Sequence, residues 1–123
     1  MKLMMLLLVC CSSSVSNESD ETHVDNQDIS ERITSALSNS VEKGLIIFKS
    51  KACESCHNEK SEIAPSLTGF SRRDQIAGTV KNTTDNLRIW LKNPQAVKPG
   101  TMMPNLYLSD DDVEVLIAYL QTL

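Results

Sequence analysis

The clearest periodic pattern lies near the end of the chain. Ser109 and Asp112 form the pattern of a capping box, in which each satisfies a free backbone N–H at the start of a helix. The apolar residues after them recur at helical spacing and share one face: Val113, Leu116, Ile117 and Leu120. We therefore predict a helix that begins after Ser109 and buries this face.

A second amphipathic pattern precedes the first cysteine of the central part of the chain. Val41, Leu45 and Phe48 follow one another at i, i+4 and i+7, and Asn39 and Glu42 again have the spacing of a capping box. The sequence predicts that a helix begins near residue 39 and runs up to the cysteines.

A third pattern lies between these two helices. Leu87, Trp90 and Leu91 share one face of a predicted helix from about Thr84 to Lys92, and the proline at position 94 ends it. Residues 58–83 and 94–108 are rich in residues that favour loops, with a short helical turn expected around 71–77 and no convincing strand. We predict an all-α domain with long loops.

The first residues of the chain are predicted to form a targeting signal. Leu3 to Val9 form an apolar run after Lys2, far too short to cross a bilayer. The run ends at Cys10 and Cys11 and resembles a bacterial lipoprotein signal, in which such a cysteine is lipidated. We favour Cys11, because the residue before it is small, with Cys10 as the alternative; a plain cleaved signal is the other interpretation. Both predict export, and lipidation predicts anchoring in the periplasm or at the outer face of the cell membrane.

Residues 11–38 differ in composition from the rest of the chain. Residues 12–39 carry six acidic side chains against one arginine, a net charge of −5, whereas ten acidic and ten basic side chains balance from residue 40 onward. Such a polar, charged segment buries too little apolar surface to fold alone. We predict a signal of residues 1–10, an acidic flexible tether of residues 11–38 and a domain of residues 39–123. A weak helical pattern near the end of the tether comprises Ile29, Ile33, Ala36 and Leu37.

The composition adds two constraints. The formal charge of −4 excludes a generally basic nucleic-acid binder, so nucleic acid is not an expected partner. Aromatic residues make up only 4% of the chain, so a core built from its own side chains would be thin. The domain is therefore expected to rely on an additional stabilising group.

The segment Cys53-Glu54-Ser55-Cys56-His57 has the pattern that attaches c-type haem. Two thiols at this spacing each form a thioether with one haem vinyl group, and the adjacent histidine supplies an imidazole nitrogen to the iron. We predict one covalently bound haem c, attached through Cys53 and Cys56, with His57 as an axial ligand of the iron.

Three other uses of this cysteine pair are less well supported. A structural zinc site needs four ligands, and the only further histidine is His23 in the tether. A thioredoxin-like redox pair needs a βαβ setting, which no pattern here indicates. A structural disulfide would close a very short loop and would leave His57 without a role. Haem attachment is therefore the favoured interpretation.

The second axial position has few candidates. His23 is remote in the tether, and the methionines of residues 1–10 are lost with the signal. Met102 and Met103 remain, in a loop bounded by prolines and a glycine. A His/Met pair is a ligand set of c-type cytochromes that raises the reduction potential. On these grounds alone either methionine qualifies, and packing in the core is the alternative for both.

From residue 40 onward the chain resembles a class I cytochrome c, and more closely the cytochrome c domain fused to subunit II of caa-type cytochrome oxidases. The resemblance implies a fold in which the N- and C-terminal helices pack together around the haem, with Gly44 and Phe48 near Tyr119. The oxidase subunit also has a copper-binding domain and membrane helices, so we expect this chain to be the cytochrome module in free-standing form. The matching stretches are Gly44-x-x-x-Phe48, Ile63 to Thr68, Ala77 to Thr79, Asn86 to Leu106, Leu108 to Val113, and Ala118 to Leu120.

The resemblance also implies roles around the iron. The distal ligand of the family is the methionine directly before a proline, which selects Met103 over Met102. The carbonyl of Pro65 is expected to accept the Nδ1–H of His57, and Asn105 is expected to orient the Met103 sulfur. The family also implies two contacts with the haem propionates. One is expected from the indole N–H of Trp90, and the other from the guanidinium of Arg72 or Arg73.

The function implied is that of an electron carrier and not of an enzyme. A quinol–cytochrome c reductase-like donor and a terminal oxidase-like acceptor are the expected redox partners, with the membrane reached through the lipid anchor. The alternatives are a haem enzyme or gas or redox sensor whose Met103 ligand is displaced, and an assembly subunit that keeps its haem for structure. Five lysines are candidates for a docking surface near the haem edge: Lys49, Lys51, Lys60, Lys81 and Lys98.

Overall fold

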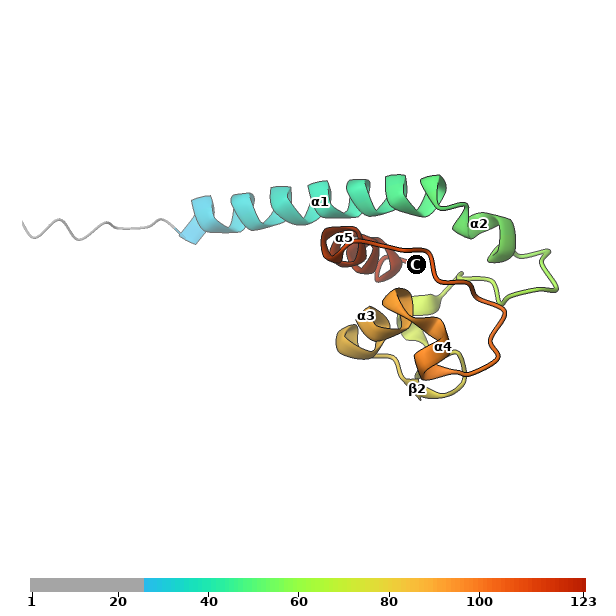
Figure 1. The fold of residues 1–123 in the computed structure, drawn as a ribbon. Coiled ribbons are helices and arrows are strands. Elements are labelled where there is room, and N and C mark those ends of the chain that lie inside the picture. Colours follow the sequence, from blue (N-terminus) through green and yellow to red (C-terminus); the bar gives the residue numbers. More distant parts are fainter. Residues whose placement is uncertain (1–25) are drawn as a thin grey trace, which may run out of the picture.

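The computed structural model describes residues 26–123, and all of its long elements are helices. A long helix, α1 (Asn26–Ser50), packs on the last helix, α5 (Asp110–Leu120), and the elements within residues 70–97 lie on the other side of α5 (Figure 1). The predicted all-α fold, with its first and last helices packed together, is confirmed. The predictions for the signal, for Cys10 and Cys11 and for His23 lie outside the described residues.

The contact between α1 and α5 depends on a glycine. A Cβ atom at Gly44 would lie 2.6 Å from the Cβ of Tyr119 and closer still to the backbone carbonyl of Val115, so no larger residue fits without moving a helix. One turn later, the ring of Phe48 packs against that of Tyr119 with 5.3 Å between the ring centres. The predicted packing of Gly44 and Phe48 near Tyr119 is therefore confirmed.

The two other long helical patterns also form as predicted. Helix α3 spans Thr84–Lys92, and the hydroxyl of Thr83 accepts the backbone N–H of Asn86 at its start. Helix α5 begins with the complete capping box of Ser109 and Asp112. The apolar faces of both helices are buried in one core, which contains Leu87, Leu91, Val113, Leu116, Ile117 and Leu120.

The predicted start of the first helix is wrong. Helix α1 begins at Asn26, so Asn39 and Glu42 lie inside it and form no cap. Residues 26–38, expected to belong to the flexible tether, are helical, yet their side chains are exposed, including Ile33 and Leu37. Once the docked part of a helix has formed, each further residue adds a hydrogen bond without a new nucleation cost, and this accounts for the extension. No helix in residues 26–123 is long and apolar enough to cross a membrane.

The loop predictions need three corrections. A two-stranded antiparallel hairpin, β1 (Gln75–Ile76) and β2 (Val80–Lys81), is present where no strand was expected. The helical turn expected around 71–77 is a 3₁₀ helix, η1 (Phe70–Arg72). Helix α4 (Pro94–Val97) lies in the predicted extended loop, because the Asn93 side chain accepts the backbone N–H of Ala96 and so starts a new helix at the proline that ends α3.

Candidate haem-binding site

An apolar cavity lies between the long helices and two loops. Cys53, His57, Trp90 and Met103 all line it, although they come from three separate stretches of the chain. The other lining residues are all hydrophobic: Phe48, Leu67, Phe70, Leu87, Leu91, Leu106, Leu116 and Leu120. The fold therefore brings together a thiol, an imidazole, an indole and a thioether inside an apolar shell.

The two cysteines occupy a single helical turn, α2 (Cys53–Cys56), that comes after α1 and a sharp bend. Ala52 forms this bend with a φ of 53°, in the left-handed region. Cys53 is half-buried, and burial is the main cause that raises the pKa of its thiol. Cys56 is exposed, and the two cysteines are not joined to each other by a disulfide. Both thiols are therefore free for a bond to another group.

The imidazole of His57 is held by the backbone. Its Nδ1 lies 2.9 Å from the carbonyl oxygen of Pro65. A carbonyl oxygen only accepts hydrogen bonds, so Nδ1 carries a proton and Nε2 is the ring nitrogen left to bind a metal. This contact is the one implied by the family resemblance, and it orients His57 in the way that second-shell partners orient a metal-binding histidine. The iron-ligand role of His57 stays a prediction.

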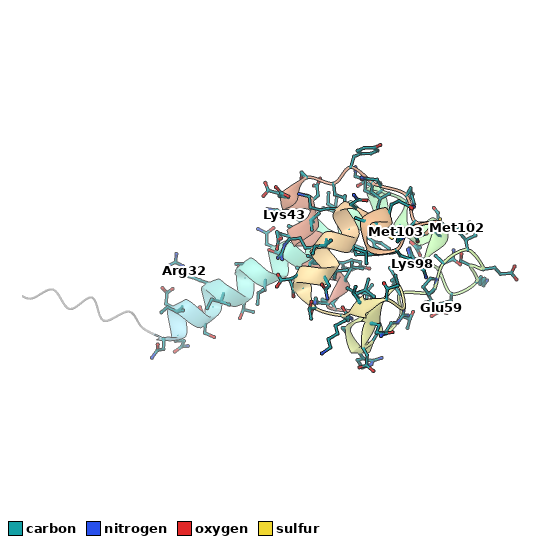
Figure 2. All side chains as sticks on the ribbon, turned by 60° about the horizontal axis from the view of Figure 1, so that its bottom comes forward. Arg32, Lys43, Glu59, Lys98, Met102 and Met103 are labelled. Atoms are coloured by element: carbon teal, nitrogen blue, oxygen red, sulfur yellow. The ribbon has the colours of Figure 1, made fainter. Side chains whose placement is uncertain are left out.

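The structure distinguishes the two methionines. Met103 is half-buried and lines the cavity, whereas the side chain of Met102 is 76% exposed. Figure 2 shows the pair in the same loop, with Met103 nearer to the body of the domain. Neighbouring side chains in an extended loop point in different directions, so only one of the two reaches the cavity. This arrangement supports Met103 as the candidate ligand.

The residues expected near the haem propionates are less closely grouped. Trp90 lines the cavity, but neither Arg72 nor Arg73 does. Arg73 donates to the backbone carbonyls of Ser66 and Thr68 and so stabilises the loop after the CxxCH segment. Arg72 is exposed. In the structure Arg73 therefore binds the backbone of a nearby loop. The contacts of Trp90, Arg72 and Arg73 with the propionates stay predictions.

The side chain of Asn105 forms a local turn after Met103. Its side-chain oxygen accepts the backbone N–H of Tyr107 at 2.8 Å, and no hydrogen bond joins it to Met103 among the described residues. This turn forms because the side-chain oxygen of an asparagine easily reaches the backbone N–H of the residue two positions later. Asn105 thus shapes the chain after Met103, and its contact with the sulfur stays a prediction.

Two side chains hold the loop around Met103 through contacts that the sequence did not predict. The ammonium group of Lys51 donates to the carbonyl of Leu106 at 3.2 Å, and the side chain of Gln95 bonds to the backbone of Gly100 and Thr101. Lys51 was expected only as one of the lysines of a docking surface near the haem edge. No local pattern marks these contacts, since Lys51 and Leu106 are 55 positions apart.

Charged side chains join α3 to α5 beside the cavity. Arg88 on α3 forms hydrogen-bonded ion pairs with Glu114 on α5 and with Asp85 on its own helix. The bond from Arg88 is the main cause that lowers the pKa of Glu114. Lys92 pairs with Asp110 at the start of α5, and this bond lowers the pKa of that carboxyl group.

The donor set and its surroundings fit a haem. Within residues 26–123, no three His, Cys, Asp or Glu side chains group closely enough to hold a metal ion by themselves. An apolar shell with an oriented imidazole on one side and a thioether on another suits an iron that is carried in a large, flat, apolar macrocycle. The chain would hold such a group through Cys53 and Cys56 and ligate its iron through His57 and Met103.

Comparison with known proteins agrees with this interpretation. The sequence model of the cytochrome c family matches residues 41–123. The chain belongs to the cytochrome c family. No solved structure matches the chain significantly.

Three curated relatives are called cytochrome c oxidase subunit 2. The chain is 36% identical to the protein from Alkalihalophilus pseudofirmus, over 76% of this chain and 28% of the relative. It is 36% identical to that from Bacillus subtilis, over 73% and 28%, and 34% identical to that from Bacillus sp. strain PS3, over 66% and 25%. The chain thus spans about a quarter of the length of these relatives. It is a cytochrome c domain related to one part of them, and the usual role of such a domain is electron transfer.

Proposed function

We propose that this protein is a membrane-tethered monohaem cytochrome that passes single electrons between respiratory partners. The observation that carries the proposal is the meeting of Cys53, His57 and Met103 at one apolar cavity, with the His57 imidazole oriented by Pro65. The proposed donor is a quinol–cytochrome c reductase-like protein, and the proposed acceptor is a terminal oxidase. Relatedness to an oxidase subunit supports this respiratory context.

The side chains have distinct parts in this function. A bound haem would supply one-electron chemistry at its iron. Cys53 and Cys56 would hold it covalently, and His57 and Met103 would both ligate the iron, which would leave no iron site for a substrate. The hydrophobic lining excludes water and keeps the site rigid. An electron carrier needs these properties, and an enzyme acting on a bound substrate needs an open site instead.

We further propose that the domain works outside the cytoplasm, in the periplasm or at the outer face of the cell membrane, where lipid at Cys11 anchors it. The lipoprotein-like pattern that ends at Cys10 and Cys11 supports the anchor. A tether keeps a domain at high effective concentration near membrane-bound partners. The helical residues 26–38 form the last part of this connection, and they extend past the other elements (Figure 1).

Haem attachment is tested by changing Cys53 and Cys56 to alanine together. The wild type is expected to keep its haem on the chain after denaturation in acid and organic solvent, and the double variant to lose it. A Cys11→Ala variant is the control and should keep covalent haem. Haem that stays on the double variant would refute the attachment site.

The electron-carrier role is tested by the spectrum of the oxidised protein at neutral pH. A stable low-spin spectrum with a Met–iron charge-transfer band is expected, because both axial positions are filled. A high-spin spectrum would instead support the haem enzyme or sensor.

The anchor is tested with a labelled fatty acid. The label should appear on the wild type and be absent from Cys11→Ala. Label that persists in Cys11→Ala and disappears in Cys10→Ala would move the site by one residue. Label that is absent from the wild type would remove the anchor from the proposal.

A further inference from the structure

The loop that carries Met103 has little apolar packing of its own. We call residues 98–106 the Met103 loop; no helix or strand forms within it. Only Thr101, Met103 and Leu106 are half-buried there, and the other residues are exposed. The position of the Met103 sulfur therefore depends on the hydrogen bonds that hold this loop to the rest of the domain.

Gln95 holds the beginning of the loop. Its Nε2 donates to the carbonyl of Thr101 at 2.6 Å, and its Oε1 accepts the backbone N–H of Gly100 at 3.0 Å. Gly100 has a φ of 80°, which turns the chain back toward the cavity. The hydroxyl of Thr101 then lies 3.4 Å from the backbone N–H of Met103, a long bond that continues this arrangement up to the methionine.

Lys51 holds the end of the loop. Its half-buried ammonium group donates to the carbonyl of Leu106 at 3.2 Å. Leu106 is the third residue after Met103, so at most about 11 Å of extended chain separates the held carbonyl from the methionine. Pro104 lies in this short stretch and restricts it further. Little slack therefore remains between Met103 and the contact with Lys51.

Lys51 is also placed where three parts of the domain meet. It follows α1 directly and precedes Cys53 by two positions. Its charge also reaches the Asp112 carboxyl at the start of α5, whose pKa is lowered mainly by hydrogen bonds from Ser109 and to a smaller extent by Lys51. One ammonium group thus joins the end of α1 to the Met103 loop, and its charge acts weakly on the first turn of α5.

We propose that Lys51 and Gln95 are positioning residues that hold the two ends of the Met103 loop and so keep the Met103 sulfur on the iron. This inference rests on the proposed function, because it takes Met103 as the axial ligand. Its consequence is kinetic: the loop opens more often when either contact is removed, and an added ligand then replaces Met103 faster.

The test is the rate at which imidazole displaces Met103 in the oxidised full-length haem protein. Lys51→Met and Gln95→Met remove the two contacts while keeping side chains of similar length. A hydrogen bond from a charged group contributes enough that its loss should raise the displacement rate about tenfold or more for Lys51→Met. The smaller effect, about threefold, is expected for Gln95→Met, because its bonds are neutral.

Two variants control for charge and for general destabilisation. Lys49→Met removes the same charge from an exposed lysine one position before the end of α1, and it should leave the rate unchanged. Lys51→Arg keeps a charged donor and should stay near the wild-type rate. Backbone hydrogen exchange at Met103 and Tyr107 should increase in Lys51→Met and not in Lys49→Met, whether or not the sulfur binds iron.

The outcomes separate this inference from the proposed function. A wild type without a Met–iron band would overturn the axial assignment and the positioning role together. A normal wild-type band, with equal displacement rates in Lys51→Met, Gln95→Met and Lys49→Met, would overturn the positioning role alone. Failure of Lys51→Met to fold, with no change in Gln95→Met, would also overturn it, because Lys51 would then support the whole domain.

Discussion

The long helices and the loops that face them are held together by different means. Helix α5 buries Val113, Leu116, Ile117 and Leu120 in a shared core, and its contact with α1 is close enough to require Gly44. The loops on either side of the cavity bury few side chains. Each depends instead on individual hydrogen bonds to the backbone, from Arg73 in one loop and from Lys51 in the other.

The residues that stabilise the fold therefore differ from the candidate residues for the chemistry. Burial in the helical core is shared among many side chains, so the loss of one contact is partly compensated by its neighbours. The candidate iron ligands lie outside that core: His57 directly follows α2, and Met103 lies in a loop. The positions of residues on such loops depend on single hydrogen bonds, so the loss of one bond is enough to displace them. Substitutions in the helices should therefore change stability most, and substitutions in the loops should change the haem site most.

The largest effect on stability is expected from Gly44→Ala. The added Cβ would meet the backbone of Val115 and the Cβ of Tyr119, and backbone atoms cannot move aside as a side-chain tip can. Alanine is the better helix former by about 1 kcal/mol, yet we expect a net loss of about 3 kcal/mol in the free energy of unfolding. Denaturant unfolding followed by circular dichroism measures the loss.

The exposed neighbour Lys43 provides the control for this change. Lys43→Ala alters the same helix without touching α5 and should change the free energy of unfolding by at most about 0.5 kcal/mol. Equal stabilities of the Gly44→Ala and Lys43→Ala variants would show that the two helices are less tightly packed than the structure indicates.

The loop side is tested by Met103→Ala. This change should abolish the Met–iron charge-transfer band, lower the reduction potential and open the iron to carbon monoxide. Loss of the half-buried side chain should also cost about 2 kcal/mol of unfolding free energy. Met102→Ala is the matched control and should leave the spectrum unchanged, since its side chain is 76% exposed. The reverse result would assign the ligand to Met102.

The same division explains which features the sequence predicted. Helices α3 and α5 are encoded locally by an apolar stripe and a capping residue, and both were found. The early start of α1 was not predicted, although Ile29, Ile33, Ala36 and Leu37 form a weak helical pattern there, because residues 26–38 bury nothing and the pattern stays weak. Helix α4 was missed because Pro94, which ends α3, also begins the next helix. The hairpin was missed because each strand has only two residues.

The candidate site shows a similar limit. Cys53, Cys56 and His57 form a contiguous motif and became candidates from the sequence pattern alone, whereas the choice of Met103 over Met102 needed the family resemblance. The contact of Lys51 with Leu106 joins positions that are distant in the chain and exists only in the folded protein. Sequence patterns thus indicate the candidate groups for the chemistry, and the fold is needed to find the residues that position them.

A smaller effect, with the opposite sign, is expected from Tyr107→Gly. Tyr107 has a φ of 51°, a left-handed conformation that is unfavourable for a bulky side chain, and the residue is 86% exposed. Glycine relieves the strain, so the free energy of unfolding should rise by about 1 kcal/mol. Tyr107→Ala keeps a Cβ atom at this φ and should give no such gain. Equal free energies of unfolding for Tyr107→Gly and Tyr107→Ala would show that the left-handed conformation at this position costs no stability.

The smallest effect is expected from Arg88→Met, because its ion pairs with Glu114 and Asp85 are exposed to solvent and screened by salt. Arg88 lowers the pKa of Glu114 from its ordinary value of 4.5. A lowered folded-state pKa stabilises the protein above the ordinary pKa, and this contribution disappears as the pH falls through the folded value. The wild type should therefore be more stable than Arg88→Met at pH 7, by a margin that shrinks toward pH 3.

The ion pair of Arg32 with Asp28 offers a matched control for this pH dependence. It joins two residues of α1 at 4.0 Å, and Figure 2 shows Arg32 on the part of the helix that extends beyond the rest of the domain. Arg32→Met should leave the unfolding midpoint nearly unchanged at both pH values, since this pair joins no separate elements. A margin for Arg88→Met that stays constant between pH 7 and pH 3 would show that Arg88 stabilises the contact of α3 with α5 by packing its aliphatic stem and not by its charge.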